Sequence, residues 1–81
     1  MEPKEIEKKI IEILAYMGEL SPENVDLSED FSIYVRPNSK RLLAAKIDVQ
    51  FPKVNGTILY NALFSEIITG EEIVEFILEY Y

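Results

Sequence analysis

The sequence contains no cysteine and no histidine. Without cysteine the chain can form no disulfide, supply no thiolate nucleophile and bind no zinc ion through sulfur. Without histidine it lacks the commonest general base and metal ligand, and serine–histidine and cysteine–histidine catalysis are both excluded. Because these absences remove the most frequent routes to catalysis, we predict that the protein is not an enzyme and holds no metal ion.

Long apolar runs and basic residues are also scarce. No stretch of about 18 apolar residues is present that could span a membrane, and the opening residues Met1–Glu5 lack the apolar core of a signal peptide. Eight lysines and arginines stand against fifteen aspartates and glutamates, which gives a net charge of −7. Because nucleic acid and anionic membranes repel such a chain, we expect a cytoplasmic protein that binds neither.

The apolar residues that are present suffice for one modest core. They make up 48% of the 81 positions, which predicts a single domain over residues 1–81, and we expect a monomer. The charge is unevenly distributed: residues 1–35 hold nine acids and three bases, and residues 54–81 hold five acids and no base. Residues 36–53, which we call the basic segment, hold five bases and one acid. A basic segment between acidic flanks is a candidate surface for docking a partner.

Helical signals are clearest at the two ends of the chain. Apolar residues recur at helical spacing over residues 3–17 and again from Thr69 to the last residue. Thr69 and Glu72 have the spacing of a capping box, which marks the start of the final helix. Thr57 can cap a further helix that reaches Ile67.

The sequence pattern in the middle of the chain fits both a β-hairpin and a helix. Apolar and polar residues alternate over residues 31–36 and 45–51, with a turn-forming segment at 37–40 between them, and this pattern predicts a β-hairpin. The residues Leu43, Ile47 and Phe51 are also spaced by four, which predicts a helix. Local pattern favours the hairpin, and both interpretations remain open at this point.

The order of these features resembles the acyl and peptidyl carrier proteins. In that family a first amphipathic helix leads into a long loop that ends at a buried aromatic residue, and residues 20–31 match this loop with Phe31 at its end. The family's modified serine lies eight residues after the aromatic, which is the position of Ser39 here. Residues 68–77 are similar to the family's last helix. The resemblance therefore covers nearly the whole chain.

The resemblance implies an all-α fold, a small bundle of three main helices plus a short helix, with an α+β fold carrying a hairpin at 31–51 as the alternative. It implies that Ser39 carries a covalent 4′-phosphopantetheine arm. It also implies that Asn38, which replaces the aspartate that usually precedes the serine, belongs to the cofactor-binding site. Such a protein would carry acyl intermediates as thioesters in fatty-acid, polyketide or related biosynthesis. Its partners would be a phosphopantetheinyl transferase and acyl-processing enzymes.

Two further sites follow from the resemblance. The apolar faces of the second and third helices would shelter an acyl chain, and the residues expected near that cavity are Ile47, Phe51, Ile58, Leu59 and Leu63. Lys40, Arg41 and Lys46 would dock partners, on a helix that is usually acidic in the family. Arg36 and Lys40 replace the family's glycine and leucine around the serine. Two alternative functions remain, namely an α+β protein-interaction module and a carrier-like fold without the prosthetic arm.

Overall fold

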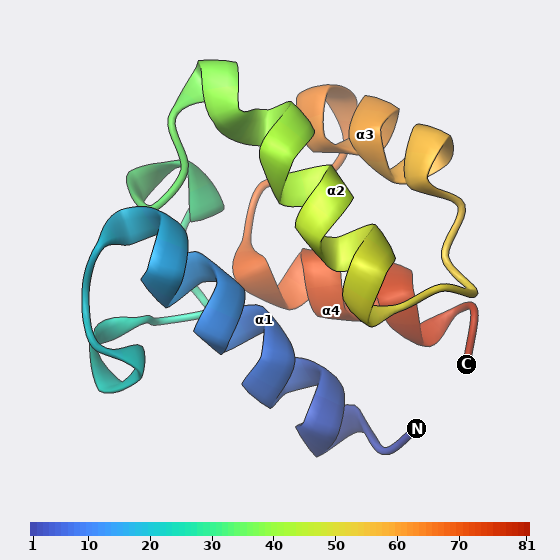
Figure 1. Cartoon of the computed structure of the whole chain (residues 1–81), viewed down its shortest axis with the longest axis horizontal. Helices are drawn as coiled ribbons and strands as arrows, with labels where there is room; N and C mark the ends of the chain where they lie inside the picture. Colours follow the sequence, from blue (N-terminus) through green and yellow to red (C-terminus); the bar gives the residue numbers. More distant parts are fainter.

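A computed structural model describes residues 1–81 and shows four α-helices that enclose one core (Figure 1). The helices are α1 (Pro3–Gly18), α2 (Lys40–Gln50), α3 (Gly56–Ser65) and α4 (Gly70–Leu78). Between α1 and α2 lie three single turns of 3-10 helix, η1 (Pro22–Asn24), η2 (Phe31–Ile33) and η3 (Pro37–Ser39). The chain contains no strand, and the only β-type pairing is an isolated bridge between Asp30 and Thr69. The predicted all-α bundle is confirmed.

The hairpin predicted from local alternation is therefore wrong. Strand alternation would place Val49 on the same face as Ile47, whereas the structure leaves Val49 77% exposed and buries Leu43, Ile47 and Phe51 completely. The helical spacing of those three residues presents one continuous apolar face to the other helices. A two-stranded ribbon has little stability by itself and would offer the core a narrower surface, so packing selects the helix.

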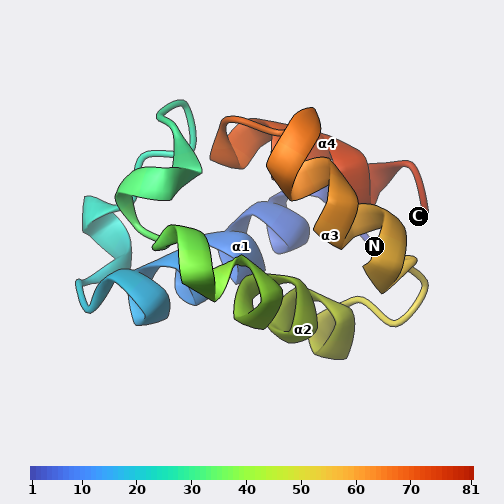
Figure 2. The same cartoon turned by 90° about the horizontal axis from the view of Figure 1, so that it is seen from above.

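The core is entirely apolar. Twenty residues are buried, and none of them is charged or polar. Helix α1 packs mainly against α4, α2 packs mainly against α3, and α1 also contacts α2. Figure 2 shows the bundle from above, with α2 beside α1 and with α4 on the opposite side of the view from α2. No helix of the structure has both the length and the apolar composition needed to cross a bilayer.

Local capping defines the ends of the helices. The predicted helix over residues 3–17 is confirmed as α1, which ends where Glu19 takes up a left-handed conformation with φ of 56°. The predicted capping box of α4 is also confirmed, because Thr69 Oγ1 accepts the Glu72 N–H and Glu72 Oε1 accepts the Thr69 N–H. The cap of α3 differs from the prediction: Asn55, not Thr57, accepts hydrogen bonds at the first turn.

The long segment between α1 and α2 is attached to the start of α4 through its backbone. The Phe31 N–H donates to the Ile68 carbonyl at 2.9 Å, and the Glu71 N–H donates to the Leu27 carbonyl at 2.8 Å. This approach requires a residue without a side chain at position 70, because a Cβ there would lie 2.7 Å from Leu27 Cδ2 and 3.1 Å from Leu27 Cα. Gly70 therefore lets the loop lie directly against α4.

We expect Gly70→Ala to destabilise the protein by about 1–3 kcal/mol, because the added methyl group would overlap the Leu27 side chain and press on the Leu27 backbone at 3.1 Å. The measurement is urea unfolding followed by circular dichroism. Gly56→Ala is the matched control, since it also lies in the first turn of a helix but its Cβ would meet only Asp48, at an ordinary distance of 3.5 Å. Helix propensity should leave that variant as stable as the parent or more stable. Equal effects of the two substitutions would contradict the proposed contact.

Candidate functional site

Ser39 lies at the start of α2, where it is the N-cap residue. It completes the turn η3, and its backbone N–H donates to the Arg36 carbonyl at 2.9 Å. Its side chain makes no capping hydrogen bond with the helix. The residue is only half-buried. The Ser39 hydroxyl is therefore not used to hold the fold together, and it is reachable from solvent.

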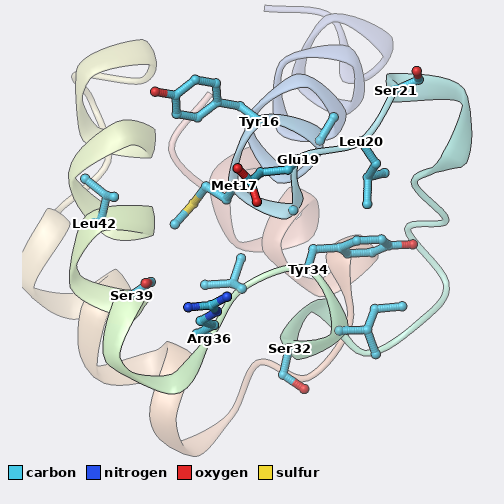
Figure 3. A pocket seen from close by; sticks show the side chains of 14 residues that line it. Tyr16, Met17, Glu19, Leu20, Ser21, Ser32, Tyr34, Arg36, Ser39 and Leu42 are labelled. Carbon is cyan, nitrogen blue, oxygen red and sulfur yellow. The ribbon is translucent and has the colours of Figure 1, made fainter.

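An open groove runs beside Ser39. Its volume is about 970 Å³, and its walls come from the end of α1, the turns η2 and η3 and the first part of α2. Eight of its fourteen lining residues are hydrophobic, among them Met17, Tyr34 and Leu42. Figure 3 shows Ser39 and Arg36 at one end of this space, with Tyr16 and Leu42 on facing walls. We call it the Ser39 groove.

The segment from Phe31 to Ser39 contains two tight turns, η2 and η3. Phe31 is buried at the centre of the core, and Asp30 accepts the Ser32 N–H at 2.8 Å to start η2. Tyr34 then folds back on the loop, where its hydroxyl accepts the Asp26 N–H at 2.7 Å. These contacts fix the chain between the core and the first turn of α2, so the position of Ser39 is determined by the loop.

Lys40 connects the start of α2 to the end of α3. Its Nζ donates to the Leu63 carbonyl at 3.1 Å and lies 4.5 Å from the centre of the Phe64 ring and 5.6 Å from that of Phe31. A lysine at the carboxyl end of a helix is stabilised by the exposed carbonyls there, and aromatic faces attract the ammonium group. The structure thus gives Lys40, predicted as a docking residue, a role inside the fold.

The second residue expected to bind the cofactor and the other two expected docking residues lie at or near the surface. Asn38 is exposed within η3, and Arg41 is exposed on the first turn of α2. Lys46 lies one turn further along α2, where its Nζ is 4.4 Å from the centre of the Tyr16 ring of α1. Arg41 therefore remains exposed at the surface, whereas Lys46 is half-buried against Tyr16.

The residues expected to surround an acyl chain do not line the Ser39 groove. Four of them lie together in the closed core with exposures of 1% or less, namely Ile47, Phe51, Leu59 and Leu63. The fifth, Ile58, lies outside the core and is 51% exposed. The sequence interpretation did not assign Tyr16, Met17 and Leu42 to a site, because Met17 continues the apolar stripe of the first helix and Leu42 belongs to the apolar pattern of the middle segment. Such positions are typical of packing residues.

Three carboxylates near this region are held in the charged form by hydrogen bonds. The pKa of Asp26 is lowered mainly by the hydroxyl of Ser28, and that of Asp30 mainly by the backbone N–H of Ser32. The pKa of Glu72 is lowered mainly by the backbone N–H of Thr69. All three act as acceptors for turns and helix starts, so the shifts have a structural cause.

Comparison with protein-family models, with curated proteins and with solved structures finds no match for this chain.

We expect Lys40→Met to lower the free energy of unfolding by about 1–3 kcal/mol, because it removes the bond to the Leu63 carbonyl and both aromatic contacts. Arg41→Met is the control, since the neighbouring exposed charge lies at the positive end of α2 and its loss should be neutral or slightly stabilising. Urea unfolding measures both variants. If Lys40→Met unfolds at the same concentration as Arg41→Met, Lys40 does not connect the two helices.

Proposed function

We propose that this chain is an acyl-carrier-type protein that bears a 4′-phosphopantetheine arm on Ser39 and serves fatty-acid, polyketide or related biosynthesis. The observation that carries the proposal is a serine hydroxyl free of intramolecular capping, at the start of α2 and beside an open groove. The order of elements supports it as well: an amphipathic first helix, a long loop ending at the buried Phe31, and a serine eight residues later.

The groups around Ser39 can stabilise the negative charge of a phosphodiester. The N–H groups at the start of α2 carry partial positive charge, and Arg36 adds a full positive charge on the same groove. In the proposed modification the Ser39 oxygen attacks the phosphorus of coenzyme A that bears pantetheine. The bond from that phosphorus to the oxygen bridging to the second phosphate breaks, adenosine 3′,5′-bisphosphate leaves, and the serine proton passes to a base of the transferase.

The arm would supply a thiol on which acyl groups are held as thioesters. This chain contributes no catalytic group to that chemistry, in keeping with a sequence that lacks cysteine and histidine. Its own residues would position the arm, expose it to partner enzymes and hold the phosphate. The proposed protein is therefore a carrier on which other enzymes act.

The proposed partners are a phosphopantetheinyl transferase and acyl-processing enzymes. The helix after the modified serine is usually acidic in carrier proteins and meets basic surfaces, whereas α2 presents the exposed Arg41 and the half-buried Lys46. Complementary charge steers association and excludes wrong partners. We therefore propose that the dedicated partners of this chain present an acidic surface to α2.

A carrier-like fold without the arm is the second candidate function. It is favoured by the residues that replace the family's usual motif, since Arg36 and Asn38 stand where glycine and aspartate are usual. In this role the same surface of α2 would bind a protein partner, and no covalent group would be attached. The loading experiment separates the two functions.

We expect incubation with coenzyme A and a promiscuous phosphopantetheinyl transferase to add about 340 Da, the mass of one phosphopantetheine group. Intact mass spectrometry measures the gain, and Ser39→Ala should abolish it. Ser39→Ala should fold like the parent, because the hydroxyl makes no cap.

The matched control is Ser32→Ala, which removes another serine hydroxyl that lines the same groove and should leave the gain intact. An unchanged mass of the parent protein under conditions that load a known carrier would leave only the role without an arm.

We expect Arg41→Glu to raise the kcat/KM of loading by a transferase whose own docking surface is basic, by about two- to tenfold. The substitution replaces a repulsive contact with an attractive one. Lys8→Glu is the control, because it makes the same charge change on an exposed site of α1, far along the sequence from Ser39. Equal effects of both variants would show that only net charge matters, and would contradict docking through α2.

A further inference from the structure

We propose that the arm on Ser39 folds back into the Ser39 groove between α1 and α2, and that its cargo extends along these two helices. The resemblance to carrier proteins implies a different place, in which the acyl chain is sheltered between α2 and α3. This inference rests on the proposed function, because it needs an arm on Ser39. It names the surface of this chain that would hold the arm and the chemistry that this surface favours.

The space between α2 and α3 is already filled. Ile47, Leu59 and Leu63 are at most 1% exposed and belong to the one core cluster of the protein. Interiors pack as densely as organic crystals, so an acyl chain could enter there only if α2 and α3 moved apart. The bond between Lys40 and the Leu63 carbonyl opposes that movement at the end nearest Ser39.

The Ser39 groove, in contrast, is open and already includes the attachment point in its wall. Its volume of about 970 Å³ is at the upper end of the range for small-molecule sites. A group attached to Ser39 needs no second encounter to reach the groove, because the covalent link gives it a high effective concentration there. The arm can therefore occupy the groove even if each of its contacts is weak.

The lining of the groove matches the mixed chemistry of pantetheine. Arg36 provides a positive charge next to the attachment point, where the phosphodiester lies (Figure 3). The lining also combines polar side chains, those of Ser32, Ser39 and Glu19, with the apolar side chains of Met17 and Leu42. Pantetheine combines the same two kinds of group, with a dimethyl group between an anionic phosphate and two amides. A purely hydrocarbon ligand would leave the polar groups of this groove unpaired.

A second hollow continues the path along the same two helices. It has a volume of about 340 Å³ and is lined by Ile13, Val49 and Lys46, among others. Tyr16 is 71% exposed and is the one residue that lines both spaces. An acyl group at the end of the arm would pass the Tyr16 ring and reach Ile13 and Val49. Four of the seven lining residues of this hollow are polar or charged, so it favours a cargo that carries polar groups beside apolar ones.

The absence of cysteine makes this proposal directly testable, because the arm's thiol would be the only thiol of the modified protein. We measure how fast that thiol reacts with a chromogenic disulfide reagent, relative to free pantetheine. We expect the reaction to be about tenfold slower in the folded carrier, which corresponds to an arm that is docked about nine-tenths of the time.

Leu42→Asp should return the rate to within about twofold of that of free pantetheine, because it removes an apolar wall and adds a second carboxylate to that of Glu19, which increases the repulsion of the phosphodiester. Ile58→Asp is the matched control: both residues are 51% exposed, but Ile58 lies on α3 and was expected near the alternative cavity. It should leave the slow reaction unchanged. Amide chemical shifts of the parent protein give a second readout, and loading should move those of Met17, Tyr34 and Leu42 more than those of Ile58 and Leu59.

The possible outcomes are distinct. If Ser39 gains no mass, no arm exists, and both this inference and the proposed function fail. If Ser39 is loaded but its thiol reacts as fast as free pantetheine, the carrier function stands and docking in the groove is overturned. If Ile58→Asp accelerates the reaction and Leu42→Asp does not, the arm lies on the α3 side, and the inference is again overturned.

Discussion

The close approach of the loop to the start of α4 is the contact on which the rest of this structure depends. Leu27 and Phe31 exchange backbone hydrogen bonds with the segment around Gly70, and the missing side chain at position 70 leaves room for the loop backbone. This contact closes the bundle at one end and buries Phe31 among the helices. Because the chain then makes only two tight turns before α2 begins, the same contact determines where Ser39 lies.

The features around Ser39 follow one arrangement. Apolar packing fixes the position of the residue, and polar groups remain free at the surface. No buried side-chain polar atom lacks a hydrogen-bond partner, and the core contains no charged residue. Lys40 connects α2 to α3 from the edge of the core, while Arg36 lines the groove. The proposed carrier function would need this combination, because an attachment site must be rigid at the base and open above it.

The outer helices could be predicted from sequence because their signals are local. Glu72 follows Thr69 by three residues, so the capping box and the start of α4 can both be recognised within one turn. Residues 31–51 could not be assigned this way, since strand and helix periods both fit and the choice depends on apolar faces supplied by α1, α3 and α4. The spacing of Phe31 and Ser39 is part of the resemblance to carrier proteins. The all-α fold that this resemblance implied is confirmed.

Other details depend on geometry that the sequence pattern does not contain. Asn55 and Thr57 are both good capping residues, and only the path of the chain after Phe51 decides that Asn55 accepts the bonds. The Ser39 groove forms between the end of α1 and two 3-10 turns, so no periodicity of one element predicts it. The hydrogen bond of Lys40 also links two residues that are 23 positions apart. Its acceptor is a backbone carbonyl, which any residue at position 63 would carry.

Native-state hydrogen exchange tests the central contact most directly. We predict that the amides of Phe31 and Glu71, which bridge the loop and α4, exchange as slowly as those of Ile10 and Leu14 in the core of α1, because all four open only when the whole domain unfolds. Exchange of Phe31 and Glu71 at the rates of an unstructured peptide, while Ile10 and Leu14 remain protected, would contradict the account. The loop would then open independently of the core, and the position of Ser39 would not be fixed by it.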